Sequence, residues 1–127
     1  MTTFVVDTHA LVWFISGDNR LSDKARTILR DPTVQLIIPV IVLAEIKYLA
    51  GKGRFAQTLE QVLLVLNTDP RCLICPIDLT VVQYMPADLD IHDSLIVGTA
   101  LAQTVHVDGV LTRDEVITGS NLVTVVW

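Results

Sequence analysis

The chain has 127 residues, close to the usual size of one domain, and 51% of them are hydrophobic, which is enough for a sizeable core. Its 14 acidic and 9 basic residues give a net charge of −5, which argues against a broad phosphate-binding surface. A nucleic-acid partner would have to be contacted locally or through a metal ion. We expect one globular domain over residues 1–127.

Nothing in the sequence suggests a membrane protein or an exported one. The longest apolar stretch, Val34 to Ile46, is interrupted by Gln35, Pro39 and Glu45 and is shorter than the roughly 20 residues that span a bilayer. The N-terminus has no basic segment ahead of an apolar one, and two cysteines are too few for a disulfide framework. We therefore expect a cytoplasmic protein with no membrane contact.

Five short apolar runs rich in strand-forming residues recur along the chain. In order they are TFVVD, VQLIIP, CLICPID, VDGVLT and LVTVVW. Segments with helical spacing or composition lie between them, and strands that alternate with helices pair in parallel through βαβ units. The sequence therefore predicts a three-layer α/β/α fold around a central parallel sheet of about five strands.

Helix signals agree with this alternation. Ser22 is suited to cap a helix over residues 23–30, and Pro39 suits the first turn of a helix over residues 41–50 that Gly51 and Gly53 end. A further apolar stripe at helical spacing is made by Leu59, Val62, Leu63 and Leu66. Asp90 is suited to cap a last helix, DIHDSLIVGTALAQ.

Cys72 and Cys75 form a C-x-x-C motif for which we expect no redox or metal role. The motif lies in a predicted strand, where residues three apart point to opposite faces of the sheet. The chain has no second cysteine pair for zinc and no helix start there to acidify a thiol.

Glu45 is the most informative residue of the sequence. Its predicted helix is apolar on nearly every side, so the carboxylate is expected to be buried, and no basic residue lies three or four positions away. A buried carboxylate is usually protonated, paired at long range or bound to a metal. The alternative is a Glu at a partly exposed edge or in a distant ion pair.

Three more carboxylates lie where a ligand site would be built. Asp93 begins a helix that looks buried all round, although capping by Asp90 and the helix dipole alone would explain both acids. Asp7 and Asp114 each follow an apolar strand, at the carboxyl edge where open α/β sheets bind ligands, unless each is a solvent-facing loop acid.

Together these four acids predict a metal site. Helix side chains point toward the helix N-terminus, so Glu45 and Asp93 would face the sheet edge that carries Asp7 and Asp114. The four carboxylates would then line one pocket. Two unit charges at 4 Å repel by about 4 kcal/mol at an effective dielectric near 20, and a divalent cation removes that penalty. Oxygen ligands favour Mg²⁺ or Mn²⁺ over zinc. Phosphodiester cleavage fits such a site, because the cation screens the phosphate from the acids.

Four segments resemble the motifs of the PIN-domain family, in particular of the VapC-type toxins of bacterial and archaeal toxin–antitoxin pairs. They are FVVDTHALVWF, IPVIVLAEI, DIHDSLIVGTALA and LTRDEVI followed by VTVVW. They occur in the family's order and spacing and cover nearly the whole chain. Each motif alone is loose, but the four together are specific.

The resemblance implies a Mg²⁺- or Mn²⁺-dependent endoribonuclease with a parallel-sheet α/β fold. Asp7, Glu45, Asp93 and Asp114 match the family's four acids, which are both its metal ligands and its catalytic residues. Thr112 matches the Thr of the last motif, T-x-D, and would orient the site, while Asp90 matches a second-tier acid. The resemblance also implies RNA as substrate, a homodimer, and inhibition by a small cognate antitoxin.

Two positions depart from the family pattern and affect RNA contact. Ser94 replaces an Arg that many members carry after the third acid, and Ala44 replaces a polar residue before the helix Glu. The candidates for local phosphate contacts are Lys47, Lys52, Arg54 and Arg113, although solvated surface charge is the better explanation for each.

Neither the histidines next to the acids nor the tryptophans need a catalytic explanation. His9 and His92 are better explained by hydrogen bonds at helix starts than by general-base catalysis. Trp13 and Trp127 are expected to be packing residues.

Two rival functions come from other classes. A phospho-accepting receiver domain is also short, acidic and Mg²⁺-binding. Such domains resemble one another in having paired acids after the first strand and a Lys after the last strand, and this chain has neither feature. A non-catalytic PIN fold that only binds RNA or protein is the second rival. The four acids favour an active enzyme.

Overall fold

The computed structural model describes residues 2–127, and Met1 lies outside the described residues. Within the described residues, five strands are separated by one or two helices each, seven helices in all. In order they are β1 (Thr3–Val6), α1 (Thr8–Ser16), α2 (Asp23–Arg30), β2 (Gln35–Pro39), α3 (Val40–Gly51), α4 (Leu59–Thr68), β3 (Cys72–Cys75), α5 (Leu79–Tyr84), α6 (Ile91–Leu101), β4 (Gly109–Leu111), α7 (Glu115–Ser120) and β5 (Val125–Val126).

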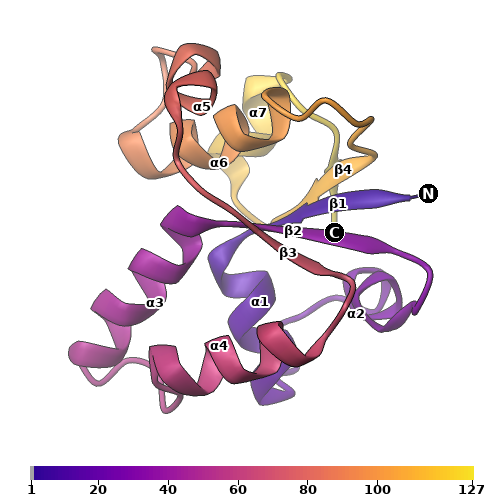
Figure 1. Ribbon diagram of the computed structural model, residues 1–127, viewed down its shortest axis with the longest axis vertical. Coiled ribbons are helices and arrows are strands. Elements are labelled where there is room, and N and C mark those ends of the chain that lie inside the picture. The colour runs from indigo at the N-terminus through magenta and orange to yellow at the C-terminus, as the bar shows by residue number, and fades with distance from the viewer. Residues whose placement is uncertain (1) are drawn as a thin grey trace.

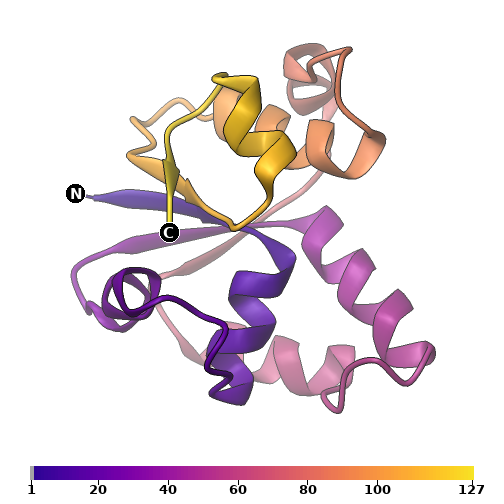
Figure 2. The same ribbon diagram turned by 180° about the vertical axis from the view of Figure 1, so that it is seen from behind.

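The five strands form one parallel sheet in the order β3-β2-β1-β4-β5. Helices α1 to α4 cover one face of the sheet and α5 to α7 cover the other, so the molecule has three layers (Figures 1 and 2). The predicted α/β/α fold, its parallel sheet and the five strand positions are confirmed.

The chain changes direction across the sheet between β1 and β4. From β1 it proceeds to β2 and β3 on one side, and later returns to β4 and β5 on the other. In open α/β sheets the crevice outside the carboxyl ends of two such strands is the usual place for a ligand. Asp7 follows β1 directly, and Asp114 lies three residues beyond the end of β4, so both acids lie at this switch point.

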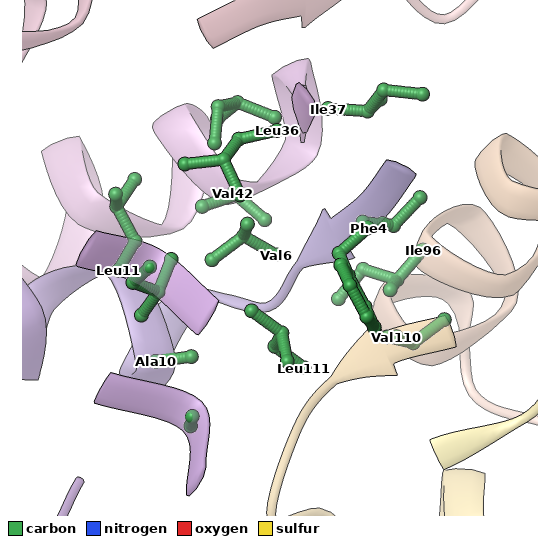
Figure 3. Packing of buried hydrophobic residues seen from close by; sticks show 14 of the residues in the cluster. Phe4, Val6, Ala10, Leu11, Leu36, Ile37, Val42, Ile96, Val110 and Leu111 are labelled. Atoms are coloured by element: carbon green, nitrogen blue, oxygen red, sulfur yellow. The ribbon is translucent and has the colours of Figure 1, made fainter. Parts of the chain in front are cut away.

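The core lies on both faces of the sheet. Val6, Leu11 and Val42 from β1, α1 and α3 gather on one side of the view in Figure 3, and Ile96 of α6 lies with strand residues on the other. At about 25 cal/mol per Å² of apolar surface, each fully buried Val or Ile contributes roughly 1.5–3 kcal/mol. The strand ends that carry the acids are therefore fixed by a packed core.

Local capping matches the expected helix starts. The Ser22 side chain accepts from Ala25 N at 3.1 Å at the start of α2, and the Asp90 side chain accepts from Asp93 N at 2.9 Å at the start of α6. Pro39 ends β2 and stands immediately before α3, one position earlier than the first turn expected for it. Neither of the short helices α5 and α7 follows from the sequence pattern.

One expectation about burial is wrong. Helix α3 is apolar on nearly every side, but it buries only the face that carries Val42, Leu43 and Ile46. Tyr48, on the opposite side, is 64% exposed. The helix packs on its neighbours with one face only, so Glu45 is half-buried at the boundary of the exposed side rather than enclosed.

No helix among residues 2–127 has both the length and the apolar character needed to cross a membrane.

Candidate active site

Asp7 is fixed by two hydrogen bonds at the end of β1. One carboxylate oxygen accepts from the backbone N–H of Thr8 at 2.6 Å, which caps α1. The other accepts from the hydroxyl of Thr112 at 2.5 Å. Burial raises the pKa of Asp7 above its usual value, against the lowering effect of these two bonds and of nearby His9, and Asp114 raises it further.

Asp114 lies opposite Asp7 as the cap of α7. Its carboxylate accepts from the backbone N–H groups of Val116 at 2.8 Å and Ile117 at 3.1 Å, and its own N–H donates to the Thr112 hydroxyl at 3.0 Å. The strand-end acid is therefore also a helix cap, a role that its position after an apolar strand does not indicate. Thr112 links Asp7 to the backbone of Asp114.

Glu45 reaches the same region from α3. Desolvation is the main cause that raises the pKa of Glu45, followed by the negative charge of Asp7, while His92 lowers it. Glu45 makes no ion pair within residues 2–127. Glu45 and His92 line a separate pocket of about 440 Å³ with residues of α3.

Asp93 connects the site electrostatically. It is 9% exposed in the first turn of α6, a helix that is buried from Asp93 to Ala100, as expected. Desolvation is the main cause that raises the pKa of Asp93, followed by the negative charges of Asp114, Asp90, Asp7 and Glu45, and together they bring it to about 6. The negative charges of all the other predicted acids therefore raise the pKa of this one carboxyl group.

The residues present provide the donors for a hard divalent cation, but they do not form a finished cage. Among residues 2–127, no group of three or more His, Cys, Asp or Glu side chains is arranged to hold a metal ion. Asp7 and Asp114 are held by hydrogen bonds to helix starts, and mutual repulsion disfavours closer approach of the acids. The donors are nevertheless oxygens only, as Mg²⁺ and Mn²⁺ require.

A buried hydroxyl next to these acids lacks a partner within residues 2–127. Thr8 is 1% exposed, and its Oγ1 has no hydrogen-bond partner of adequate geometry there, although it lies near enough to Glu45 to lower that residue's pKa. An unsatisfied buried hydroxyl costs about 1–3 kcal/mol. The orphaned oxygen and the raised pKa values of three acids fit a site that is completed by a bound cation.

A cleft of about 340 Å³ opens between Asp7 and Asp114 and carries basic and aromatic side chains as well. We call it the acid cleft; it is lined by Asp7, His9, Trp13, Arg20, Arg113 and Asp114. The guanidinium carbons of Arg20 and Arg113 lie 4.9 Å and 4.8 Å from the centre of the Trp13 ring. Two positively charged guanidinium groups therefore lie against one indole ring, beside the carboxylates of Asp7 and Asp114.

The predicted basic residues separate into two pairs. Arg113 lines the acid cleft, and Arg54 lines an adjoining cleft that shares His9, Trp13 and Arg20 with it. Lys47 and Lys52 are exposed and line neither cleft, and Lys52 Nζ lies 5.3 Å from the Tyr48 ring centre.

Arg20 was missed in the sequence, because it lies in a polar turn after α1 and only the folded chain brings it to Trp13. Trp13 packs against Trp127 with ring centres 5.9 Å apart, as expected, but it also serves as the platform for both arginines. The one sequence feature that could have indicated this platform is the Trp in the helix that follows Asp7.

The other expectations near the site have mixed outcomes. The rings of His9 and His92 make no hydrogen bond within the described chain; His9 instead packs against Trp13 at 5.4 Å. Ser94 is buried and donates to the carbonyls of Pro86 and Leu89, both at 3.0 Å, so it fixes the loop before α6. Cys72 and Cys75 are free in β3, and burial raises the Cys72 pKa to about 11, which disfavours a reactive thiolate.

Comparison with known proteins agrees with this geometry. The family model described as the PIN domain matches residues 4–118, so the chain belongs to the PIN-domain family. A chain in the crystal structure of VapBC2 from Rickettsia felis bound to a DNA fragment from their promoter has the same fold: the TM-score is 0.65 and the identity 18%, over 98% of each chain. No curated protein sequence matches the chain significantly.

Proposed function

We propose that the protein is a metal-dependent endoribonuclease, the toxin of a VapC-type toxin–antitoxin pair, built as a single domain over residues 1–127. The observation that carries the proposal is the electrostatic coupling of Asp93 to Asp114, Asp90, Asp7 and Glu45 at the sheet's switch point. Membership of a family that consists mainly of nucleases supports it. The fold shared with a VapBC2 chain supports an antitoxin partner.

Asp7, Glu45, Asp93 and Asp114 are the residues that would hold Mg²⁺ or Mn²⁺. When bound, the ion supplies charge neutralisation for the phosphate and a more acidic water. Thr112 orients the Asp7 carboxylate, and Asp90 fixes the helix start that carries Asp93. Arg113 lies at the rim of the acid cleft, where its charge suits an incoming phosphate.

A homodimer and a cytoplasmic location complete the proposal as predictions from the family resemblance. The exposed apolar residues on α3 and α5, Tyr48, Leu79 and Val82, are consistent with a protein interface of some kind. The rival of a PIN fold that only binds remains the second candidate function, because the acids do not form a finished cage in residues 2–127.

The test is cleavage of a pool of single-stranded and structured RNA by the purified chain in Mg²⁺, in Mn²⁺ and in EDTA, with a matched DNA pool beside it. The proposal predicts RNA cutting in the metals, none in EDTA, and none by Asp7→Asn. If the folded wild-type chain binds RNA but leaves it intact in every metal, the binding-only rival is correct. Equal cutting of DNA would contradict the substrate.

A further inference from the structure

A second cleft continues from the acid cleft along α1. We call it the side cleft; its volume is about 420 Å³, and it shares His9, Trp13 and Arg20 with the acid cleft. Beyond these shared residues it reaches Arg54, Phe55 and Gln57, in the loop between α3 and α4. A ligand that passes the acids can therefore extend without a break toward Phe55.

Two arginines lie where the two clefts meet, among the carboxylates that also line them. Arg20 is fixed by Asp18, with Nη2 2.8 Å from one carboxylate oxygen and Nε 3.1 Å from the other. Arg113 makes no hydrogen bond and no ion pair through its side chain within residues 2–127. Two guanidinium groups on one Trp13 ring repel each other, and an anion between them would relieve that repulsion.

The side cleft also presents aromatic surface. The Phe55 ring lies edge-on to His9, with centres 6.3 Å apart at 79°, and His9 in turn packs on Trp13. Phe55 is half-buried and His9 is exposed, so both have ring surface left for a ligand. Cations beside exposed ring faces are the usual composition of a site for single-stranded nucleic acid, where bases stack and phosphates meet Arg.

We propose that the side cleft binds the nucleotide next to the cleaved phosphate in single-stranded RNA, with its base against Phe55 and His9 and its phosphate against Arg20 and Arg113. The inference rests on the proposed nuclease function and extends it to the substrate class. A base must be unstacked to enter the cleft, so single strands and loops bind and continuous duplex does not.

Binding without cleavage tests the proposal. A fluorescently labelled single-stranded RNA of about eight nucleotides is titrated with the full-length Asp7→Asn chain in EDTA, and anisotropy gives Kd. Phe55→Leu keeps apolar packing but removes the ring, and we expect Kd to rise about 5- to 100-fold. Tyr48→Leu, which removes an exposed ring on the other side of α3, should leave Kd unchanged.

A second pair of variants tests the phosphate contact. Arg20→Ala should weaken binding and reduce the slope of log Kd against log salt by about 1, whereas Arg30→Ala, at the exposed last residue of α2, should change neither. Circular dichroism of each variant shows whether it is folded, and Arg20→Lys keeps the charge if Arg20→Ala is unfolded.

The outcomes separate this inference from the proposed function. Equal Kd values for Phe55→Leu and Tyr48→Leu overturn the inference, and so does the absence of measurable RNA binding. Variants that lose binding to the antitoxin while keeping RNA binding would make the side cleft a protein site and also overturn it. A chain that needs Phe55 and Arg20 to bind RNA but never cuts RNA disproves the nuclease alone.

Discussion

The hydroxyl of Thr112 donates a 2.5 Å hydrogen bond to the carboxylate of Asp7, although the two residues lie 105 positions apart in the chain. The same hydroxyl accepts from the backbone N–H of Asp114 at 3.0 Å. Thr112 is only 1% exposed, so water does not replace these partners. One buried side chain thus sets the position of an acid on β1 relative to an acid beyond β4.

Replacing Thr112 tests this positioning role. Thr112→Val removes the hydroxyl at constant shape and leaves one carboxylate oxygen of Asp7 and the Asp114 N–H each without a partner, at a cost of about 1–3 kcal/mol in the free energy of unfolding. We expect the metal concentration for half-maximal cleavage to rise as well. Thr112→Ser should restore both. If chemical denaturation and metal titration of Thr112→Val match wild type, Thr112 does not position the site.

The pH dependence of stability tests the state of Asp93 in the metal-free chain. Its pKa is about 6 in the folded chain, against an ordinary value of 3.8, so the folded state holds the proton more tightly than the unfolded state. Stability from this group is present below pH 3.8 and is lost as pH rises toward 6. Asp93→Asn should therefore raise Tm relative to wild type more at pH 7.5 than at pH 4.

Thermal melts in EDTA at a series of pH values measure this difference. Asp88→Asn, at an exposed acid in the loop before α6, is the matched control for the loss of one negative charge. A pH-independent difference between Asp93→Asn and wild type would contradict the raised pKa.

Metal binding should stabilise the folded chain even without RNA. Mn²⁺ at ten times its Kd adds about 1.4 kcal/mol, which raises Tm by several degrees in a domain of this size. Asp7→Asn removes one charged ligand and should abolish most of the shift. A wild-type Tm that does not respond to Mn²⁺ or Mg²⁺ would argue against a cation site at these acids.

Gly98 tests the packing of the layer that carries Asp93. A Cβ at this position would lie 3.0 Å from the Val81 carbonyl and 3.2 Å from Met85 Cγ, so Gly98→Ala should force α5 away from α6 and cost about 1–3 kcal/mol. Gly51→Ala, in open space at the end of α3, should be neutral or slightly stabilising. Urea denaturation of the two variants gives the comparison, and equal stabilities would show that α5 is not closely packed.

Much of the fold could be predicted because its signals are local. Short runs of β-branched residues mark the strands, and the segments between them have helical spacing, so the order of strands and helices along the chain can be predicted. Ser22 and Asp90 cap their helices, as their positions in the sequence indicate. The placement of Asp7 at a sheet edge also follows from one strand and its end. Parallel pairing then brings the ends of β1 and β4 together.

The remainder depends on contacts between distant segments. An apolar helix such as α3 does not reveal in its sequence which face a neighbour covers, so full burial of Glu45 was the wrong expectation. The arrangement of Arg20 and Arg113 on Trp13 joins three separate segments and has no local pattern. The Asp114 cap was missed because helix α7 is only six residues long.

The most direct test of the central claim is the rate of RNA cleavage in saturating Mn²⁺ by wild type, Glu45→Gln and Glu60→Gln. Glu60 is an exposed acid on α4, so its variant controls for loss of one negative charge. Four acids acting on one cation predict that Glu45→Gln loses at least about 100-fold in rate while Glu60→Gln keeps the wild-type rate. Equal rates for all three folded proteins would contradict the metal-dependent site.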